Sequence, residues 1–262
     1  MMETYLNGLR LAYEDEGSGP PLLLLHAFPF NGAMWNDQVA VLRDRYRVIV
    51  PDLRGFGKSG APNEVYFMQQ YADDLALLLA TLAVKQATVI GLSMGGYIAF
   101  ELWRSHRSLI NGLVLADTRA GADSSEGKVA RETNACLAES QGSTAIADIL
   151  LPKLIAPGAS DELRASLRAT ISATNPAGIA GALRGMALRP DSTIDLPTIA
   201  VPVLIIVGAE DILTPPSEAH LMQKYLPESK VALIEGAGHL SNLEQPASFN
   251  AVLSEFLDHR LG

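Results

Sequence analysis

Cysteine is nearly absent from this sequence of 262 residues, which contains only Cys136. A single thiol cannot close an intrachain disulfide, so the fold must be stable without crosslinks, as is usual in reducing compartments. We interpret Cys136 as a small, partly buried hydrophobic residue. Basic residues are also scarce: 20 lysines and arginines against 29 acidic residues give a formal net charge of −9. A surface of that sign repels polyphosphate, which argues against a nucleic-acid partner.

Long apolar runs are missing as well. The longest, at residues 21–25 and 201–207, have the length of a strand, whereas a membrane-spanning helix needs about 20 apolar residues. The first residues contain no basic segment followed by an apolar one, so we predict no signal peptide, no membrane partner and a cytoplasmic location. Hydrophobic residues make up 48% and charged residues 19%, a balance typical of a packed globular protein.

Short apolar runs alternate with helical patterns along the chain, which predicts an α/β fold with a mostly parallel sheet. Asn7-Gly8, between two short strand patterns, is typical of a β-hairpin. Six buried strands are expected at residues 22–25, 47–50, 88–90, 113–116, 203–207 and 230–234. Helices are expected at residues 71–82, 94–106, 217–225 and 247–257. Together these patterns predict an eight-stranded sheet flanked by helices.

The interval at residues 118–196 interrupts this alternation. It contains Ala- and Leu-rich helical patterns that are broken by Pro152, Pro157, Pro176 and Pro190, with Pro197 directly after it. We predict a helical cap at residues 118–196, inserted into an α/β core formed by residues 1–117 and 197–262. Apolar cap residues are expected to line the substrate pocket, and the candidates are Leu150, Leu154 and Met186.

A possible nucleophile stands in the sequence Gly91-Leu92-Ser93-Met94-Gly95, directly between a predicted strand and a predicted helix. In this context the pattern Gly-x-Ser-x-Gly favours a tight turn that lifts the serine hydroxyl out of the sheet, because the glycines avoid Cβ clashes. Ser93 also lies at a helix N-terminus, where negative charge is favoured. The alternative interpretation is an ordinary strand-to-helix turn.

A serine nucleophile needs a base, and the base needs an acid that orients it. His239 ends the glycine-rich segment 236–239 after the last predicted strand, so we predict that it is the base. Asp211 follows the strand at residues 203–207 after a three-residue turn, and we predict that it is the acid. Asp117 also ends a strand and is the alternative acid, although we expect it to take part in a local cap or ion pair with Arg119.

Acyl transfer also needs donors for the developing oxyanion. The expected donors are the backbone N–H groups of Met94, which follows the predicted nucleophile, and of Phe28, which lies in the loop after residues 22–25. His26 is expected to brace that loop. The remaining histidines are expected within or at the ends of helices as solvated or capping residues: His106, His220 and His259.

Five segments in chain order resemble the α/β-hydrolase superfamily: residues 26–29, 51–59, 91–96, 208–211 and 236–239. The order Ser93, Asp211, His239 is also the order of the triad in that fold. Residues 238–246, together with residues 214–216, are similar to 3-oxoadipate enol-lactonases and small bacterial carboxylesterases. One departure is Ala27, where the superfamily usually has glycine after the histidine, and a Cβ fits there if φ stays negative. Residues 52–59 are expected to form a tight structural loop pinned by polar contacts.

These residues predict hydrolysis of carboxylic esters through an acyl-enzyme on Ser93, with no cofactor or metal. The resemblance also implies an alternative, the opening of an enol-lactone that carries a carboxylate, for which Arg119, Arg184 and Arg189 are candidate cations. Carbon–carbon bond hydrolysis and a perhydrolase side activity are further alternatives within the superfamily. An alternative of another class is a ligand-binding receptor that keeps the triad but turns over slowly. The expected partner is a small-molecule ester or lactone.

Overall fold

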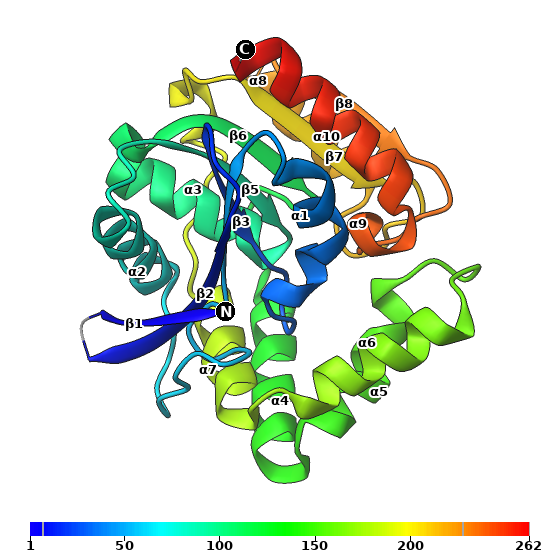
Figure 1. Ribbon diagram of the computed structural model, residues 1–262. Helices are drawn as coiled ribbons and strands as arrows, with labels where there is room; N and C mark the ends of the chain where they lie inside the picture. Colours follow the sequence, from blue (N-terminus) through cyan, green and yellow to red (C-terminus); the bar gives the residue numbers. More distant parts are fainter. Residues whose placement is uncertain (7, 227, 262) are drawn as a thin grey trace.

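The computed structural model describes residues 1–6, 8–226 and 228–261 (Figure 1). Its sheet has eight strands in the order β1-β2-β4-β3-β5-β6-β7-β8. Strands β3 to β8 run parallel, whereas β2 pairs antiparallel with both β1 and β4. The strands are β1 (Met2–Leu6), β2 (Leu9–Glu16), β3 (Pro21–Leu25), β4 (Arg47–Pro51), β5 (Ala87–Leu92), β6 (Ile110–Ala116), β7 (Val203–Gly208) and β8 (Lys230–Ile234).

This topology confirms the predicted eight-stranded, mostly parallel sheet. All six predicted parallel strands are present, and their ends differ from the predicted ones by at most three residues. In the expected hairpin Leu6 pairs with Leu9, while Asn7 lies outside the described residues. Within the described ranges, no helix is long and apolar enough to span a bilayer.

Helices cover both faces of the sheet (Figure 1). On one side α1 (Asn36–Leu42) packs against α10 (Pro246–Leu261), and on the other α2 (Met68–Thr81) packs against α3 (Met94–His106). Helix α8 (Pro216–Tyr225) packs on β7 and β8. Because both faces are covered, the central strands are apolar at consecutive positions rather than at alternate ones.

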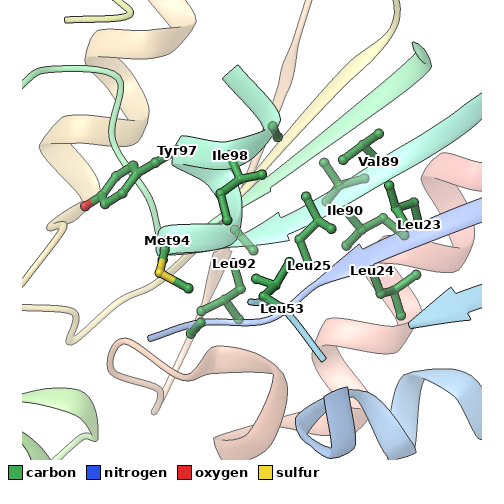
Figure 2. Packing of buried hydrophobic residues seen from close by; sticks show 14 of the residues in the cluster. Leu23, Leu24, Leu25, Leu53, Val89, Ile90, Leu92, Met94, Tyr97 and Ile98 are labelled. Atoms are coloured by element: carbon green, nitrogen blue, oxygen red, sulfur yellow. The ribbon is translucent and has the colours of Figure 1, made fainter. Parts of the chain in front are cut away.

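Part of the buried core lies where α3 meets the central strands. Figure 2 shows side chains of β3, such as Leu24, beside side chains of β5, such as Ile90, with Ile98 of α3 in the same cluster. Close approach of the helix depends on Gly95, since a Cβ there would lie 2.2 Å from the carbonyl oxygen of Leu25. The tight packing fixes the N-terminus of α3 at the carboxyl edge of the sheet, where ligands of parallel sheets bind.

Between β6 and β7 the described chain is helical and forms no strand. Helix α4 packs against α7 and α5 packs against α6, and the group lies beyond one edge of the sheet (Figure 1). Its helices are α4 (Ser125–Gln141), α5 (Ser143–Leu154), α6 (Asp161–Ala173) and α7 (Pro176–Ala187). Two expectations are wrong in detail. Pro152 lies inside α5 rather than ending it, and Cys136 is exposed on α4 rather than partly buried.

The loop after β4 is pinned by polar contacts, as expected for residues 52–59. The carboxylate of Asp52 accepts hydrogen bonds from the backbone N–H groups of Gly32 and Lys58, each at 2.8 Å. His26 braces the same loop, because its Nε2 accepts the N–H of Leu53 at 2.9 Å. These contacts hold the loop that follows β3 against the loop that follows β4, next to the carboxyl edge of β5.

Candidate active site

Ser93 lies on the turn between β5 and α3, with a φ of 56° in the left-handed region. Glycines make this turn possible, because a Cβ on Gly91 would lie 2.4 Å from the carbonyl oxygen of Gly95. The N–H of Ser93 donates to the carbonyl of Ala116 at 2.9 Å, and the Thr118 hydroxyl donates to the carbonyl of Ser93 at 2.8 Å. The local sequence and these bonds together fix the position of the Ser93 side chain.

Three side chains from separate loops meet at this turn. The Nε2 of His239 lies 2.8 Å from the Oγ of Ser93, and its Nδ1 lies 2.8 Å from the Oδ2 of Asp211. Asp211 follows β7 and His239 follows β8, so the parallel strands deliver both to the edge of the sheet that carries Ser93. His239 and Asp211 are buried, and Ser93 is half-buried. The structure thus brings together the residues proposed as nucleophile, base and acid.

Hydrogen bonds from its own loop orient the carboxylate of Asp211. Its Oδ1 accepts the N–H groups of Leu213 and Thr214 at 2.8 and 3.0 Å, and its Oδ2 accepts the Thr214 hydroxyl at 2.7 Å. Burial favours the neutral acid, but the bonds from His239 and Thr214 outweigh it and lower the pKa of Asp211. Sequence reasoning gave Thr214 no role, although an aspartate that accepts the N–H two residues on, as Asp211 does from Leu213, is a known local turn.

Asp117, the alternative acid, is buried but does not contact His239 by a hydrogen bond in the described structure. Its Oδ1 accepts the N–H of Gly208 at 2.8 Å, and its Oδ2 accepts both the N–H and the hydroxyl of Ser241. The expected local arrangement with Arg119 is therefore wrong, because Arg119 pairs with Asp123 instead. Burial and the nearby charge of Asp211 raise the pKa of Asp117 to about 7.

The pKa values of the two histidines near the site, His239 and His26, are shifted in opposite directions. Burial disfavours the charged imidazole of His239, but the hydrogen bond and charge of Asp211, with the charges of Asp117 and Glu244, raise its pKa above 6.5. Burial lowers the pKa of His26 to about 4, since its ring bonds only backbone groups among the described residues. His239 is thus the ring that can take up a proton near neutral pH.

Both residues predicted to supply oxyanion donors lie near Ser93. Met94 is the next residue in the chain, and Phe28 lines the cavity beside the serine. Neither backbone N–H has an acceptor among the described protein groups, so both are available to a bound molecule. Ala27 is buried with a φ that is not positive, so its Cβ is accommodated.

A cavity of about 240 Å³ opens above Ser93 and His239. The predicted pocket residues Leu150, Leu154 and Met186 all line it. They come from α5 and α7, and they form its apolar wall with other side chains of the sheet edge and the helices between β6 and β7. The other apolar members of this wall are Phe28, Tyr97, Ala130, Leu183 and Leu213.

Charged side chains also line the cavity, namely those of Arg119, Asp123, Arg131 and Lys153. Of the three arginines considered from the sequence, Arg119 lines the cavity, whereas Arg184 pairs with Glu132 and Glu139 on the helix surface. Arg189 is buried behind the wall, where it pairs with Asp123 and lies over the ring of Tyr97. Sequence reasoning missed Arg131 and Lys153, because helical periodicity alone does not indicate which side of a cap helix faces a cavity.

Residues 22–252 match the alpha/beta hydrolase family. The chain belongs to this family. It is 31% identical over 255 residues to 3-oxoadipate enol-lactonase 2 of Acinetobacter baylyi, covering 95% of this chain and 94% of the relative. A malate-bound thermophilic esterase from Thermogutta terrifontis has a TM-score of 0.94 and 41% identity, covering 98% of this hydrolase and 96% of that chain. The enol-lactonase from Burkholderia xenovorans has a TM-score of 0.90 and 29% identity, and the match covers 98% of this chain and 100% of the enol-lactonase chain.

The contrast between the two rings of this hydrolase predicts separate titrations. In a pH series of histidine NMR spectra, with signals assigned by His239→Gln and His26→Gln variants, His239 should titrate with a midpoint above 6.5. His26 should stay neutral down to about pH 4. Asp211→Asn should lower the His239 midpoint, because it removes the negative charge beside Nδ1. A His239 midpoint below that of His26 would contradict the electrostatics described here.

Proposed function

We propose that this hydrolase is a carboxylesterase that cleaves carboxylic esters through an acyl-enzyme on Ser93. The observation that carries the proposal is the continuous hydrogen-bonded chain from Ser93 through His239 to Asp211, next to a cavity that can receive a small molecule. Membership of the alpha/beta hydrolase family supports hydrolysis, and similarity to the T. terrifontis esterase supports an ester as substrate.

In the proposed mechanism, His239 Nε2 takes the proton of the Ser93 hydroxyl as Oγ attacks the ester carbonyl. Asp211 keeps the imidazole in the tautomer with hydrogen on Nδ1 and stabilises the cation. The N–H groups of Phe28 and Met94 donate hydrogen bonds to the oxyanion. His239 then returns the proton to the leaving alkoxide. Water, deprotonated by the same Nε2, attacks the acyl-enzyme, and the imidazolium then protonates Ser93 Oγ as the acid leaves.

We further propose that residues 118–196 act as a cap on a core of residues 1–117 and 197–262. The helices of this interval supply Leu150, Leu154 and Met186 to the cavity, whereas the loops of the sheet supply the proposed catalytic residues. In this division of roles the core carries out acyl transfer and the cap selects the substrate, through contacts that grow with the size of the acyl group.

A second candidate function is the hydrolysis of an ester or lactone that carries a carboxylate. The favouring observation is the charge of the cavity wall, where three cations, Arg119, Arg131 and Lys153, stand against the single carboxylate of Asp123. Similarity to an enol-lactonase, and to an esterase with bound malate, supports an anionic small molecule. The same proposed nucleophile and base would open a ring ester. The two candidate functions therefore differ in the substrate that the cap would select and not in the chemistry.

Replacement of the nucleophile tests the proposed reaction. We predict that Ser93→Ala lowers kcat for p-nitrophenyl acetate by on the order of 10⁴–10⁶, because the covalent step is lost. Circular dichroism should be unchanged. Ser125→Ala, an exposed serine on α4, is the matched control and should retain full activity. Near-normal activity of Ser93→Ala would overturn the mechanism. Fewer than one turnover per hour by the wild type on every ester and lactone offered would instead favour the slow-turnover receptor.

The positive charge along the cavity predicts a preference for esters that carry a carboxylate, and one substitution should weaken that preference. Ethyl hydrogen glutarate and ethyl pentanoate have acyl chains of similar length and differ in a terminal carboxylate. We predict that Lys153→Gln lowers kcat/KM for the glutarate by about fivefold relative to the pentanoate. The substitution removes the attraction between the Lys153 ammonium and the substrate carboxylate, which nearby water weakens. Lys128→Gln, a lysine of α4 that does not line the cavity, is the control and should leave the ratio unchanged. An unchanged ratio in Lys153→Gln would exclude this lysine from anion binding.

A further inference from the structure

The loop that carries His239 lies directly against the end of cap helix α5. The N–H of His239 donates to the carbonyl of Leu154, the last residue of α5, at 3.1 Å. The neighbouring Gly238 packs with no side chain in between, because a Cβ there would lie 2.7 Å from the nitrogen of Ala156 and 2.9 Å from the carbonyl carbon of Ile155. The backbone of the proposed base and the backbone of the cap are therefore in contact.

Glu244, at the end of the short helix α9 (Ser241–Glu244), bridges these two segments with one carboxylate. Its Oε1 accepts the N–H of Gly238 at 2.9 Å and lies 3.4 Å from the N–H of Leu240. Its Oε2 accepts the N–H of Ala156 at 2.7 Å. All of these partners are donors, so both ends of the side chain have to be acceptors. A half-buried carboxylate meets that requirement, and a carboxamide does not.

The cap segment held by Glu244 directly follows helix α5, which lines the cavity. Leu150, Lys153 and Leu154 of α5 all line the cavity, and the segment bonded to Glu244 begins two residues after Leu154. An acyl chain that rests on α5 is thus connected to the base through one helix end and one carboxylate. A change in the position of α5 relative to the loop of His239 would have to break or lengthen these bonds.

We propose that Glu244 is a positioning residue that couples the cap wall of the cavity to His239, so that esters long enough to contact α5 are aligned with the base. The proposal rests on the proposed esterase function. Asp117 offers an instructive comparison, because its carboxylate also bridges two loops but both belong to the sheet edge, at Gly208 and Ser241. Asp117 fastens the base to the core, whereas Glu244 fastens it to the cap.

Glu244→Gln separates the two links of this residue. The amide oxygen can keep the two N–H groups of the histidine loop, which leaves the NH₂ group facing the N–H of Ala156. The substitution therefore cuts the link to the cap and retains the link to the loop. Glu244→Ala removes both. Glu235→Gln makes the same change of charge at an exposed position near the same loop and is the matched control.

The experiment compares p-nitrophenyl acetate with p-nitrophenyl butanoate, because the butanoyl group is two carbons longer and reaches further along the cavity wall that α5 supplies. We expect Glu244→Gln to lower kcat/KM about tenfold for the butanoate and less than about threefold for the acetate. Glu244→Ala should lower both, Asp117→Asn should lower both by the same factor, and Glu235→Gln should change neither. Equal losses on both esters in Glu244→Gln, or no loss, would overturn the coupling.

Hydrogen exchange supplies a readout that does not depend on activity. In Glu244→Gln, the amides of residues 154–156 should exchange about tenfold faster than in the wild type, while Asp117→Asn should leave them protected. Unchanged protection of residues 154–156 in Glu244→Gln would also overturn the proposal. If the wild type hydrolyses neither ester, the proposed function fails, and the exchange measurement still decides whether Glu244 holds the cap to the loop.

Discussion

The backbone of Ser93 is held in the left-handed region at the carboxyl end of a central strand, a conformation that costs about 1–3 kcal/mol for a residue with a side chain. It persists because the surroundings determine it: the carbonyl of Ala116 and the hydroxyl of Thr118 bond both ends of the residue. Once this hydroxyl is fixed, the loops after β7 and β8 have to deliver their side chains to it. They pack so closely that a Cβ on Gly208 would lie 2.0 Å from the carbonyl oxygen of Gly238.

The second constraint is electrostatic. Three carboxylates, those of Asp211, Asp117 and Glu244, surround the buried imidazole of His239, and each contributes to raising its pKa. Burying several like charges is costly, and here backbone N–H groups compensate each carboxylate. The cost remains visible at Asp117, where burial and Asp211 raise the pKa to about 7. The negative charge of Asp211, which its backbone donors hold in place, would stabilise the imidazolium that forms during acyl transfer, without reorganisation at the moment of reaction.

Much of this arrangement could be predicted from local patterns. The parallel strands are continuous apolar runs, and the position of Ser93 follows from glycine spacing between a strand and a helix. Asp211 and Asp117 both follow strands, and their contacts distinguish them: Asp211 bonds the ring of His239, whereas Asp117 bonds the N–H of Gly208 and the hydroxyl of Ser241. Features that depend on tertiary packing could not be predicted. Arg131 and Lys153 line the cavity because of the way α4 and α5 are oriented in the folded protein. The periodicity of the sequence does not indicate that orientation.

Detection of the covalent intermediate would test directly whether Ser93 is the nucleophile. The enzyme is mixed with p-nitrophenyl butanoate, quenched in acid within milliseconds and digested, and the peptides are examined by mass spectrometry. If Ser93 is the nucleophile, the peptide that contains it should carry a butanoyl group, located on that serine by fragmentation and absent from Ser93→Ala. A substrate turned over at full rate with no adduct in the wild type, or an adduct confined to another residue, would contradict this role of Ser93.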